Sequence, residues 1–263
     1  MKRAPLSIAV LAVLALTGCV AVPVPSQTAP SSSAAPDPLT GTVTVFAAAS
    51  LTETLSAMAD AFSAEHPNVK VTLNFGGSSG LATQIVQGAP ADVFAAASGT
   101  TMKTVTDAGL ATGVPTVFAT NTLEIATPPG NPGQVTGLAD FANPHLTIAL
   151  CAVEVPCGAA SKTVLAAAGV VAAPDTYEQD VKAVLSKIEL GEVDAGLVYK
   201  TDVLVAGGKV EGISFPQASK AVGTYPIVRL TASINANAAD AFIAFVLSPA
   251  GGKILGDAGF GAP

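Results

Sequence analysis

The chain of 263 residues has few of the groups that recognise metals, carboxylates or nucleic acids. It contains two His, three Tyr and, after its first three residues, a single Arg, Arg229. A ferric site would call for several Tyr, His or carboxylate ligands, and an organic-acid site usually uses the guanidinium fork of Arg. The formal net charge of −7 argues against nucleic acid, which needs a basic surface. Neutral groups are therefore the main candidates for ligand recognition.

The chain also lacks the marks of a nucleotide-binding or membrane-spanning protein. It has no G-x-x-x-x-G-K-[ST] loop, so it is not expected to bind ATP. After the first 20 residues, no apolar run reaches the roughly 18 residues that a transmembrane helix needs. Half of the residues are apolar and only 12% are charged. The bulk of the chain is therefore expected to fold as a globular body.

The N-terminus has the pattern of a targeting signal. A short basic start precedes an apolar run from Leu6 to Leu16, which is too short to span a bilayer and which leads into Thr17-Gly18-Cys19. This ending resembles a bacterial lipobox, so residues 1–18 are predicted to be a signal peptide and Cys19 to carry a lipid. An ordinary secretory signal with a chance cysteine is the alternative. In both cases the mature chain works outside the cytoplasm; with the lipid, it is anchored to the outer face of the bacterial cell membrane.

Residues 19–40 are rich in Pro, Ser and Ala and almost uncharged, so they are predicted to form a disordered tether.

The body from residue 41 to residue 263 is long enough for one large domain or two lobes. It contains Cys151 and Cys157, and an even pair outside the cytoplasm favours a disulfide over two free buried thiols. A metal site on this pair is not expected, because two sulfurs without a nearby His are too few ligands.

Apolar, β-branched runs alternate with helical patterns along the body, which indicates an α/β fold. Apolar faces predict helices from Leu51 to Phe62 and from Val181 to Ile188, and a closing helical pair at Ala238–Leu247 and Pro249–Leu255. No internal repeat is found. Strands are predicted at Thr42–Ala47, Val69–Phe75, Ala91–Ala96, Thr122–Thr127, Leu146–Leu150, Ala195–Tyr199, Gly212–Phe215 and Tyr225–Thr231.

Ser50 and Ser78 each stand where a strand is expected to stop and a helix to start. Ser50 follows the run Val43–Ala49, and Ser78 follows Leu73–Gly77. A hydroxyl at a helix N-terminus lies beside unpaired backbone N–H groups and the positive end of the helix dipole, which is a favourable place for an anion. Neither of these two strand-to-helix junctions contains Lys or Arg. The sequence therefore predicts an anion held by neutral donors.

Four segments of the body together resemble the extracytoplasmic molybdate-binding proteins of ABC importers, within the larger group of two-lobed periplasmic binding proteins. The resemblance covers essentially the whole body, and it is the order of the segments that makes it specific. The segments are Val45–Thr52, Phe75–Ile85 continued by Gly88–Phe94, Val155–Gly158 and Gly196–Asp202.

The resemblance implies a type II periplasmic-binding-protein fold, in which two hinge crossings join two lobes around a ligand cleft. The crossings are expected in the irregular stretches near residues 119–123 and 217–224. Lobe 1 would then consist of residues 41–121 and 222–263, and lobe 2 of residues 122–221. The implied protein is a monomeric binding protein, not an enzyme, that captures molybdate or tungstate without a cofactor. It would deliver this anion to a permease in the membrane.

In the family, hydroxyls and backbone N–H groups bind the oxyanion, with no direct ligand to a metal ion. By resemblance, Ser50 and Ser78 fall on the two serines of its motifs, and Tyr199 on the tyrosine whose hydroxyl completes the site. Cys157 and Val181 fall on residues that supply backbone N–H groups. Such a set suits molybdate and tungstate, because these dianions carry no proton and Ser, Tyr and N–H groups can all donate.

Two features depart from the family pattern, and one residue raises a question. Gly76 and Gly77 stand where more substituted residues are often seen, which is expected to loosen the loop. The cysteine at position 157, commonly alanine in the family, puts the predicted disulfide beside the ligand and is expected to stiffen that wall. Asp180 precedes a predicted donor and would repel an anion unless it points away; its direction does not follow from the sequence.

Each predicted ligand also has a purely structural interpretation. Ser50 with Glu53 three residues later forms a capping box, and Ser78 suits the N-cap of a helix in a Gly-rich turn. Tyr199 can close a strand with its hydroxyl in water. Val181 can serve only in core packing, and Cys157 only in the disulfide.

The segment Gly76–Gly80 also matches the G-x-S-x-G elbow of hydrolases, with Ser78 as the nucleophile. His145 is the only His after it. The elbow explains neither Ser50 nor Tyr199, so a secreted serine esterase is the distant alternative. A binding protein of the same fold for sulfate or another oxyanion is the closer alternative.

Overall fold

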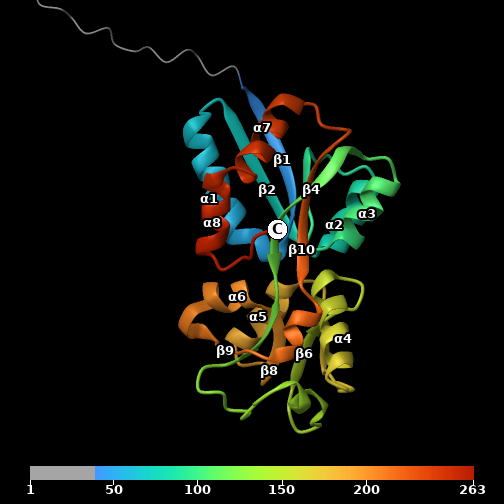
Figure 1. The fold of residues 1–263 in the computed structure, drawn as a ribbon, viewed down its shortest axis with the longest axis vertical. Coiled ribbons are helices and arrows are strands. Elements are labelled where there is room, and N and C mark those ends of the chain that lie inside the picture. The colour runs from blue at the N-terminus through green and yellow to red at the C-terminus, as the bar shows by residue number, and fades with distance from the viewer. Residues whose placement is uncertain (1–38) are drawn as a thin grey trace, which may run out of the picture. The chain divides into compact units, whose positions relative to one another are not determined.

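The computed structural model describes residues 39–263. The predicted signal peptide, Cys19 and almost all of the predicted tether lie outside the described residues. The body is built on two five-stranded sheets, each covered by helices (Figure 1). We call the elements on the first sheet lobe 1 and those on the second lobe 2. The first sheet has the order β2-β1-β3-β10-β4 and the second β7-β6-β8-β5-β9.

The sheets are mixed. In lobe 1, β1 runs parallel to β2 and β3, whereas β10 is antiparallel to β3 and β4; in lobe 2, β6 runs parallel to β7 and β8, whereas β5 is antiparallel to β8 and β9. The strand bounds are β1 Gly41–Ala48, β2 Val69–Gly76, β3 Val93–Ala95, β4 Ala111–Asn121, β5 Leu123–Thr127, β6 Ile148–Cys151, β7 Thr176–Glu178, β8 Ala195–Tyr199, β9 Glu211–Ile213 and β10 Gly223–Leu230.

Helices flank the first sheet on both sides, with α1, α7 and α8 on one side and α2 and α3 on the other (Figure 1). Helices α4, α5 and α6 belong to lobe 2. The bounds are α1 Thr52–Glu65, α2 Ser78–Val86, α3 Gly99–Asp107, α4 Pro156–Ala167, α5 Val181–Glu189, α6 Lys200–Ala206, α7 Ala236–Val246 and α8 Pro249–Asp257, with 3-10 turns η1 Ala49–Leu51, η2 Leu138–Ala142, η3 Gly207–Lys209 and η4 Pro216–Lys220.

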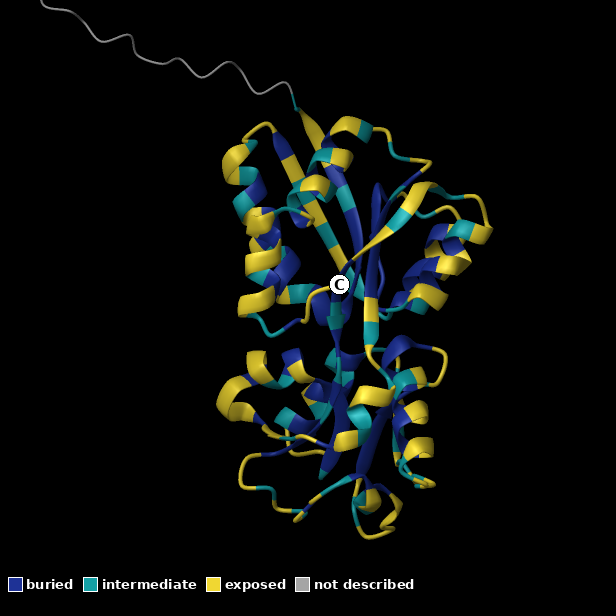
Figure 2. Cartoon of the chain, in the orientation of Figure 1, coloured by how far each residue is buried: buried dark blue, intermediate teal, exposed yellow. Residues whose placement is uncertain are grey.

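Successive side chains of β1 point to opposite faces of the first sheet, and both faces are covered by helices. Val43 and Val45 pack in the core with α1, α7 and α8, whereas Phe46 packs in the core with α2 and α3, as the period of two in a strand requires. Lobe 2 has one continuous core, to which Ala49 of lobe 1 also contributes. Figure 2 shows the result, with buried strands and exposed outer faces of the helices.

The predicted α/β fold class is confirmed, but two strands were missed. The edge strand β7 has only three residues. Strand β4 contains Gly113 and Pro115, which weaken its strand signal; it is tolerated because it lies at the edge of the sheet. Residues 119–121 therefore belong to a strand, and the prediction of an irregular stretch there is wrong.

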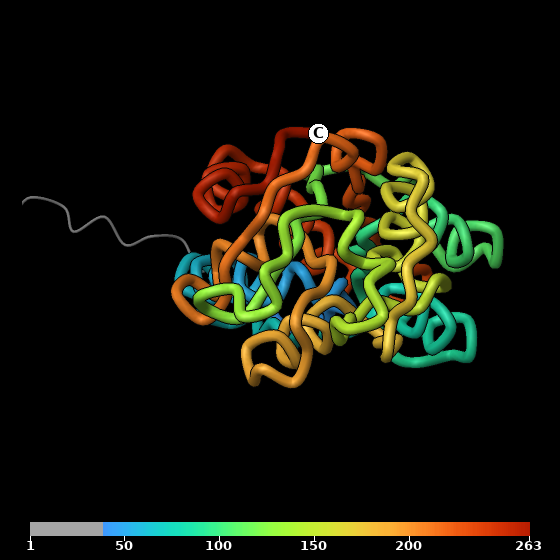
Figure 3. Tube along the Cα trace, turned by 90° about the horizontal axis from the view of Figure 1, so that it is seen from below, coloured from blue at the N-terminus to red at the C-terminus, as the bar shows by residue number. Residues whose placement is uncertain are grey.

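The chain passes from the first sheet to the second between Asn121 and Leu123, and it returns through η4 to Gly223. The segment between β5 and β6 covers the far end of lobe 2, as the view from below shows (Figure 3). At the other end of the chain, Gly261 exchanges two backbone hydrogen bonds of 2.9 Å with Thr120 on β4. These bonds hold the C-terminus against the first crossing.

No single helix within residues 39–263 has the length and apolarity to cross a membrane. Helices α7 and α8 reach that length only as a pair, and the chain bends by 55° between them. Both contribute buried residues to the core of lobe 1, including Phe242 and Leu255.

Candidate functional site

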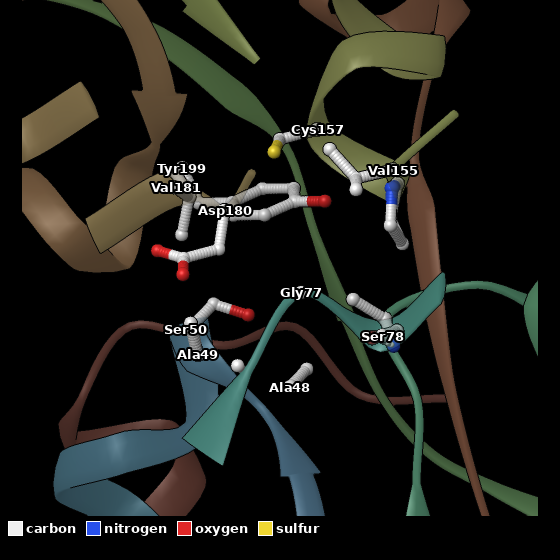
Figure 4. A pocket seen from close by; sticks show the side chains of 13 residues that line it. Ala48, Ala49, Ser50, Gly77, Ser78, Val155, Cys157, Asp180, Val181 and Tyr199 are labelled. Atoms are coloured by element: carbon white, nitrogen blue, oxygen red, sulfur yellow. Dashed lines mark hydrogen bonds between the residues drawn. The ribbon is translucent and has the colours of Figure 1, made fainter. Parts of the chain in front are cut away.

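A small cavity of about 20 Å³ lies between the two lobes. Its volume is slightly larger than a single buried water requires, so it suits a guest of few atoms. All five residues predicted as ligands line it, and Figure 4 shows the Ser50 and Tyr199 hydroxyls reaching into the same space from different elements. The walls are Ala48, Ala49, Ser50, Gly76, Gly77, Ser78, Ala97, Val155, Pro156, Cys157, Asp180, Val181 and Tyr199.

Three helices begin at this cavity. Ser78 is the first residue of α2, Cys157 the second residue of α4 and Val181 the first residue of α5. The first N–H groups of a helix have no acceptor within it, and they carry the positive end of its dipole. Lobe 1 supplies one of these helix ends and lobe 2 the other two. An anion in the cavity would thus meet unpaired N–H groups from both lobes.

The two serines have fixed partners behind the cavity wall. Ser50 lies in η1 and its Oγ is 3.0 Å from the Tyr225 hydroxyl oxygen. Ser78 Oγ accepts the Ala97 N–H at 3.0 Å, so the Ser78 proton remains free for another acceptor. Neither serine caps a helix: the N-caps of α1 and α2 are Leu51 and Gly77. The capping interpretations of both serines are therefore wrong.

Tyr199 ends β8 and is only 2% exposed, so the interpretation with its hydroxyl in water is wrong. Burial raises the pKa of Tyr199 well above its usual value, and the nearby Asp202 carboxylate raises it further. The phenol therefore keeps its proton at every physiological pH, and it can donate to an anion.

The structure contains the disulfide between Cys151 and Cys157. It joins the end of β6 to the first turn of α4, and so it fixes the backbone that carries the Cys157 N–H. The adjacent Gly158 lies against the same loop, because a Cβ there would be 1.9 Å from the Ala152 carbonyl oxygen. A side chain at position 158 would push α4 away from the cavity.

The lobes touch at Gly77. A Cβ on Gly77 would lie 2.1 Å from the Gln179 carbonyl oxygen and 3.4 Å from Val155 Cγ1, both in lobe 2. Two residues further on, Ser79 Oγ donates to the Glu154 carbonyl oxygen across the same boundary at 2.6 Å. The sequence led us to expect that this glycine loosens the loop. Its observed place instead indicates that it allows close approach of the two lobes.

Asp180 lines the cavity and caps α5. One of its carboxylate oxygens accepts the Ala183 N–H at 3.0 Å, so part of its charge interacts with the helix end. Figure 4 shows the carboxylate near Ser50, on the cavity side of α5. The acid therefore does not point away, and among residues 39–263 it is the one charged group in the cavity wall.

An ion network that sequence reasoning missed links the lobes beside the cavity. Lys182 Nζ lies 2.9 Å from Glu53 Oε1 of α1 and 3.2 Å from Asp202 Oδ1 of α6. Glu53 thus pairs across the lobes instead of forming a capping box. Burial raises the pKa of Asp202 to about 6, although the Lys182 charge and the Tyr199 N–H oppose that shift.

Burial tends to lower the pKa of Lys182, but the Asp202 and Glu53 carboxylates outweigh it and leave the pKa raised. The ammonium is therefore charged and engaged by two carboxylates. No distinct sequence signal marks this cluster, because its three members come from three separate helices.

The arrangement does not assemble the hydrolase triad considered from the sequence. Ser78 Oγ accepts from a backbone N–H, and His145, in the exposed segment before β6, is not part of the cavity wall. Within residues 39–263, no group of three or more His, Cys, Asp or Glu is placed to hold a metal ion.

Comparison with known proteins identifies the family. Residues 43–261 match the model of the bacterial extracellular solute-binding proteins. The chain is 40% identical over 263 residues to the molybdate-binding protein ModA of Mycobacterium tuberculosis, and the match covers 100% of both chains.

Two solved structures share the fold. The periplasmic molybdate-binding protein of Azotobacter vinelandii superposes with a TM-score of 0.74 at 24% identity, over 84% of this chain and 99% of that one. The sulfate-binding protein SubI of Mycobacterium tuberculosis superposes with a TM-score of 0.72 at 17% identity, over 83% and 86%. Together with the family match, they confirm the predicted two-lobed fold: the chain belongs to the bacterial extracellular solute-binding protein family.

Proposed function

We propose that this chain is the substrate-binding component of an ABC importer for molybdate, and that tungstate binds to the same site. The full-length identity to a protein named for molybdate binding supports this cargo. The observation that carries the proposal is the cavity itself, in which three helix N-termini and three hydroxyls converge from both lobes. No Lys or Arg of the described part of the chain lines it.

This set of donors matches the chemistry of molybdate. The dianion offers only acceptors, and each hydrogen bond to a charged partner contributes roughly 1.5–3 kcal/mol. Ser78 already accepts from Ala97, so its remaining proton can only be donated outward. Six or seven such bonds would offset much of the desolvation cost of the anion. Sulfate has the same charge but is smaller, so it would not reach all donors at once.

Binding would couple to closure of the lobes. Lobe 1 supplies Ser50 and Ser78, and lobe 2 supplies Tyr199 together with the N–H groups of Cys157 and Val181. An anion favours the closed form only to the extent that it contacts both lobes better there. The ion pair between Glu53 and Lys182 adds a contact across the cleft that is independent of the anion. The closed form would be the one that the permease recognises.

The remaining parts of the proposal concern the place of the protein in the cell. We infer that a lipid on Cys19 anchors it, that residues 19–40 act as its tether, and that it works as a monomeric binding protein with no enzymatic activity and no cofactor. The family membership supports an extracytoplasmic location, and the lipid follows from the lipobox pattern.

Two other anions are alternative ligands for this site. Sulfate is the alternative for a wall made only of donors. Hydrogen phosphate is favoured by one specific observation, the Asp180 carboxylate in the cavity wall, because it could accept the proton that this anion carries. The N-capping bond to Ala183 occupies part of that carboxylate, so molybdate remains the better match.

Calorimetric titration of the purified protein with four anions tests the proposal. We expect molybdate and tungstate to bind within about tenfold of each other, and sulfate and phosphate to bind at least about 100-fold more weakly, which corresponds to the loss of one or two charge-assisted hydrogen bonds. Sulfate or phosphate affinity within about tenfold of that for molybdate would assign the protein a different cargo.

A further inference from the structure

Tyr225 lies directly behind the cavity and does not line it. It belongs to β10, is fully buried, and its hydroxyl oxygen is 3.0 Å from Ser50 Oγ. Its ring packs edge-on against Phe260 and Phe118, with centroid distances of 5.3 Å and 6.4 Å. The ring therefore has a packing role, but packing does not require a buried hydroxyl, which costs free energy unless its hydrogen bonds are made.

The direction of the bond between Tyr225 and Ser50 follows from counting protons. Each hydroxyl has one proton to donate and lone pairs that accept. If Ser50 donates to a fully deprotonated anion, it has no proton left for Tyr225. The 3.0 Å contact can then exist only with Tyr225 as the donor. Ser78 has the same arrangement, because the Ala97 N–H behind it can only donate.

Two side chains besides Ser50 approach the Tyr225 hydroxyl. The Tyr199 hydroxyl is one of them and is a second acceptor for the Tyr225 proton, but Ser50 Oγ lies at a hydrogen-bonding distance of 3.0 Å. Asn121 is the other, and its amide can only donate to Tyr225.

Asn121 Oδ1 accepts the Thr122 N–H at 2.9 Å, which fixes the orientation of the Asn121 amide, and Nδ2 donates to Thr201 Oγ1 at 2.8 Å. The same amide side chain approaches the Tyr225 hydroxyl as a hydrogen-bond partner. A row of donors thus runs from the crossing between the lobes to Ser50. Burial also raises the pKa of Tyr225, so the phenol stays protonated.

We propose that Tyr225 is a positioning residue of the oxyanion site, whose hydroxyl donates to Ser50 Oγ and thereby directs the Ser50 proton at the bound anion. This inference rests on the proposed function. It also assigns a source of specificity. With Tyr225 in place, Ser50 is used as a donor and offers little to an anion that carries its own proton, such as hydrogen phosphate.

Tyr225→Phe removes this hydroxyl and keeps the ring. We expect calorimetry to show about a tenfold loss of molybdate affinity, the effect of one weakened charge-assisted hydrogen bond, and a smaller gap between molybdate and phosphate. Tyr177→Phe is the matched control, because Tyr177 is 60% exposed on β7 and its hydroxyl should not matter. A Tyr225→Phe protein that binds molybdate within about twofold of wild type would overturn the inference.

A double-mutant cycle separates positioning from packing. If Tyr225 acts through Ser50, then Tyr225→Phe should cost no further affinity in a Ser50→Ala background. A further loss of about tenfold in that background would show that Tyr225 acts otherwise, and would refute the inference while leaving the proposed function intact. If the wild-type protein fails to bind molybdate, the proposed function is wrong. The same cycle run with sulfate then decides whether Tyr225 acts on Ser50.

Discussion

Gly77→Ala is expected to lower the molybdate affinity by at least about 100-fold. The added Cβ would lie 2.1 Å from the Gln179 carbonyl oxygen, and this oxygen belongs to the backbone of the other lobe. The lobes would have to separate to relieve the overlap. Donors of lobe 2 would then move away from the anion, and losing one or two charge-assisted hydrogen bonds costs roughly 3 kcal/mol.

The same substitution should leave each lobe intact. Gly77 has φ −60° and ψ 123°, which alanine adopts without strain. The expected signature is therefore lost binding with little change in the thermal unfolding of the anion-free protein. Gly80→Ala is the matched control, because Gly80 lies in the first turn of α2, the helix that follows Gly77, and a Cβ there meets nothing within 4 Å.

Calorimetry measures the affinity, and small-angle X-ray scattering with excess molybdate reports the separation of the lobes. We expect Gly77→Ala to keep a larger radius of gyration than Gly80→Ala. Unchanged affinity in Gly77→Ala would mean that the anion does not need the contact between the lobes seen here, and would contradict the proposed closure.

Ser78→Ala should weaken molybdate binding by more than about tenfold. The change removes a donor to the anion, which contributes roughly 1.5–3 kcal/mol. It also deprives the Ala97 N–H of its acceptor, although a bound anion or a water could take that place. The fold should persist, because the Ser78 side chain does not cap its helix.

Ser186→Ala serves as the control for Ser78→Ala, since it removes an exposed hydroxyl from helix α5. Isothermal calorimetry and a thermal shift with and without molybdate would measure both variants. If Ser78→Ala binds as tightly as Ser186→Ala, then Ser78 does not contact the anion.

Much of the fold could be predicted from the sequence, because local patterns determine it. The apolar, β-branched run of β1 and the apolar face of α1 are visible without any tertiary information, and both elements exist in the structure. Strand β4 could not be found in this way. Its Gly113 and Pro115 are tolerated only because it lies at the edge of the sheet, and position within a sheet is not a local property.

In the candidate site too, local sequence motifs marked some residues and left others unmarked. Ser50, Ser78 and Tyr199 stand at strand-to-helix junctions that a sequence motif can mark, and the structure brings them to one cavity. Their roles as ligands remain predictions. Gly77 and Tyr225 gain their importance from residues about 100 and 175 positions away. The Gly77 contact forms only when the lobes meet, and the Tyr225 contact forms only when the first sheet is assembled, so the sequence motifs did not reveal them.

The central claim is that uncharged donors from both lobes hold the anion. Anomalous X-ray diffraction from crystals grown with tungstate tests it most directly, because tungsten scatters strongly and locates the anion. We expect one strong peak in the cavity, with its oxygens within hydrogen-bonding distance of the Ser50, Ser78 and Tyr199 hydroxyls and of the Cys157 and Val181 N–H groups. A peak beside Lys182 or at any other charged group, with the cavity left unoccupied, would contradict it.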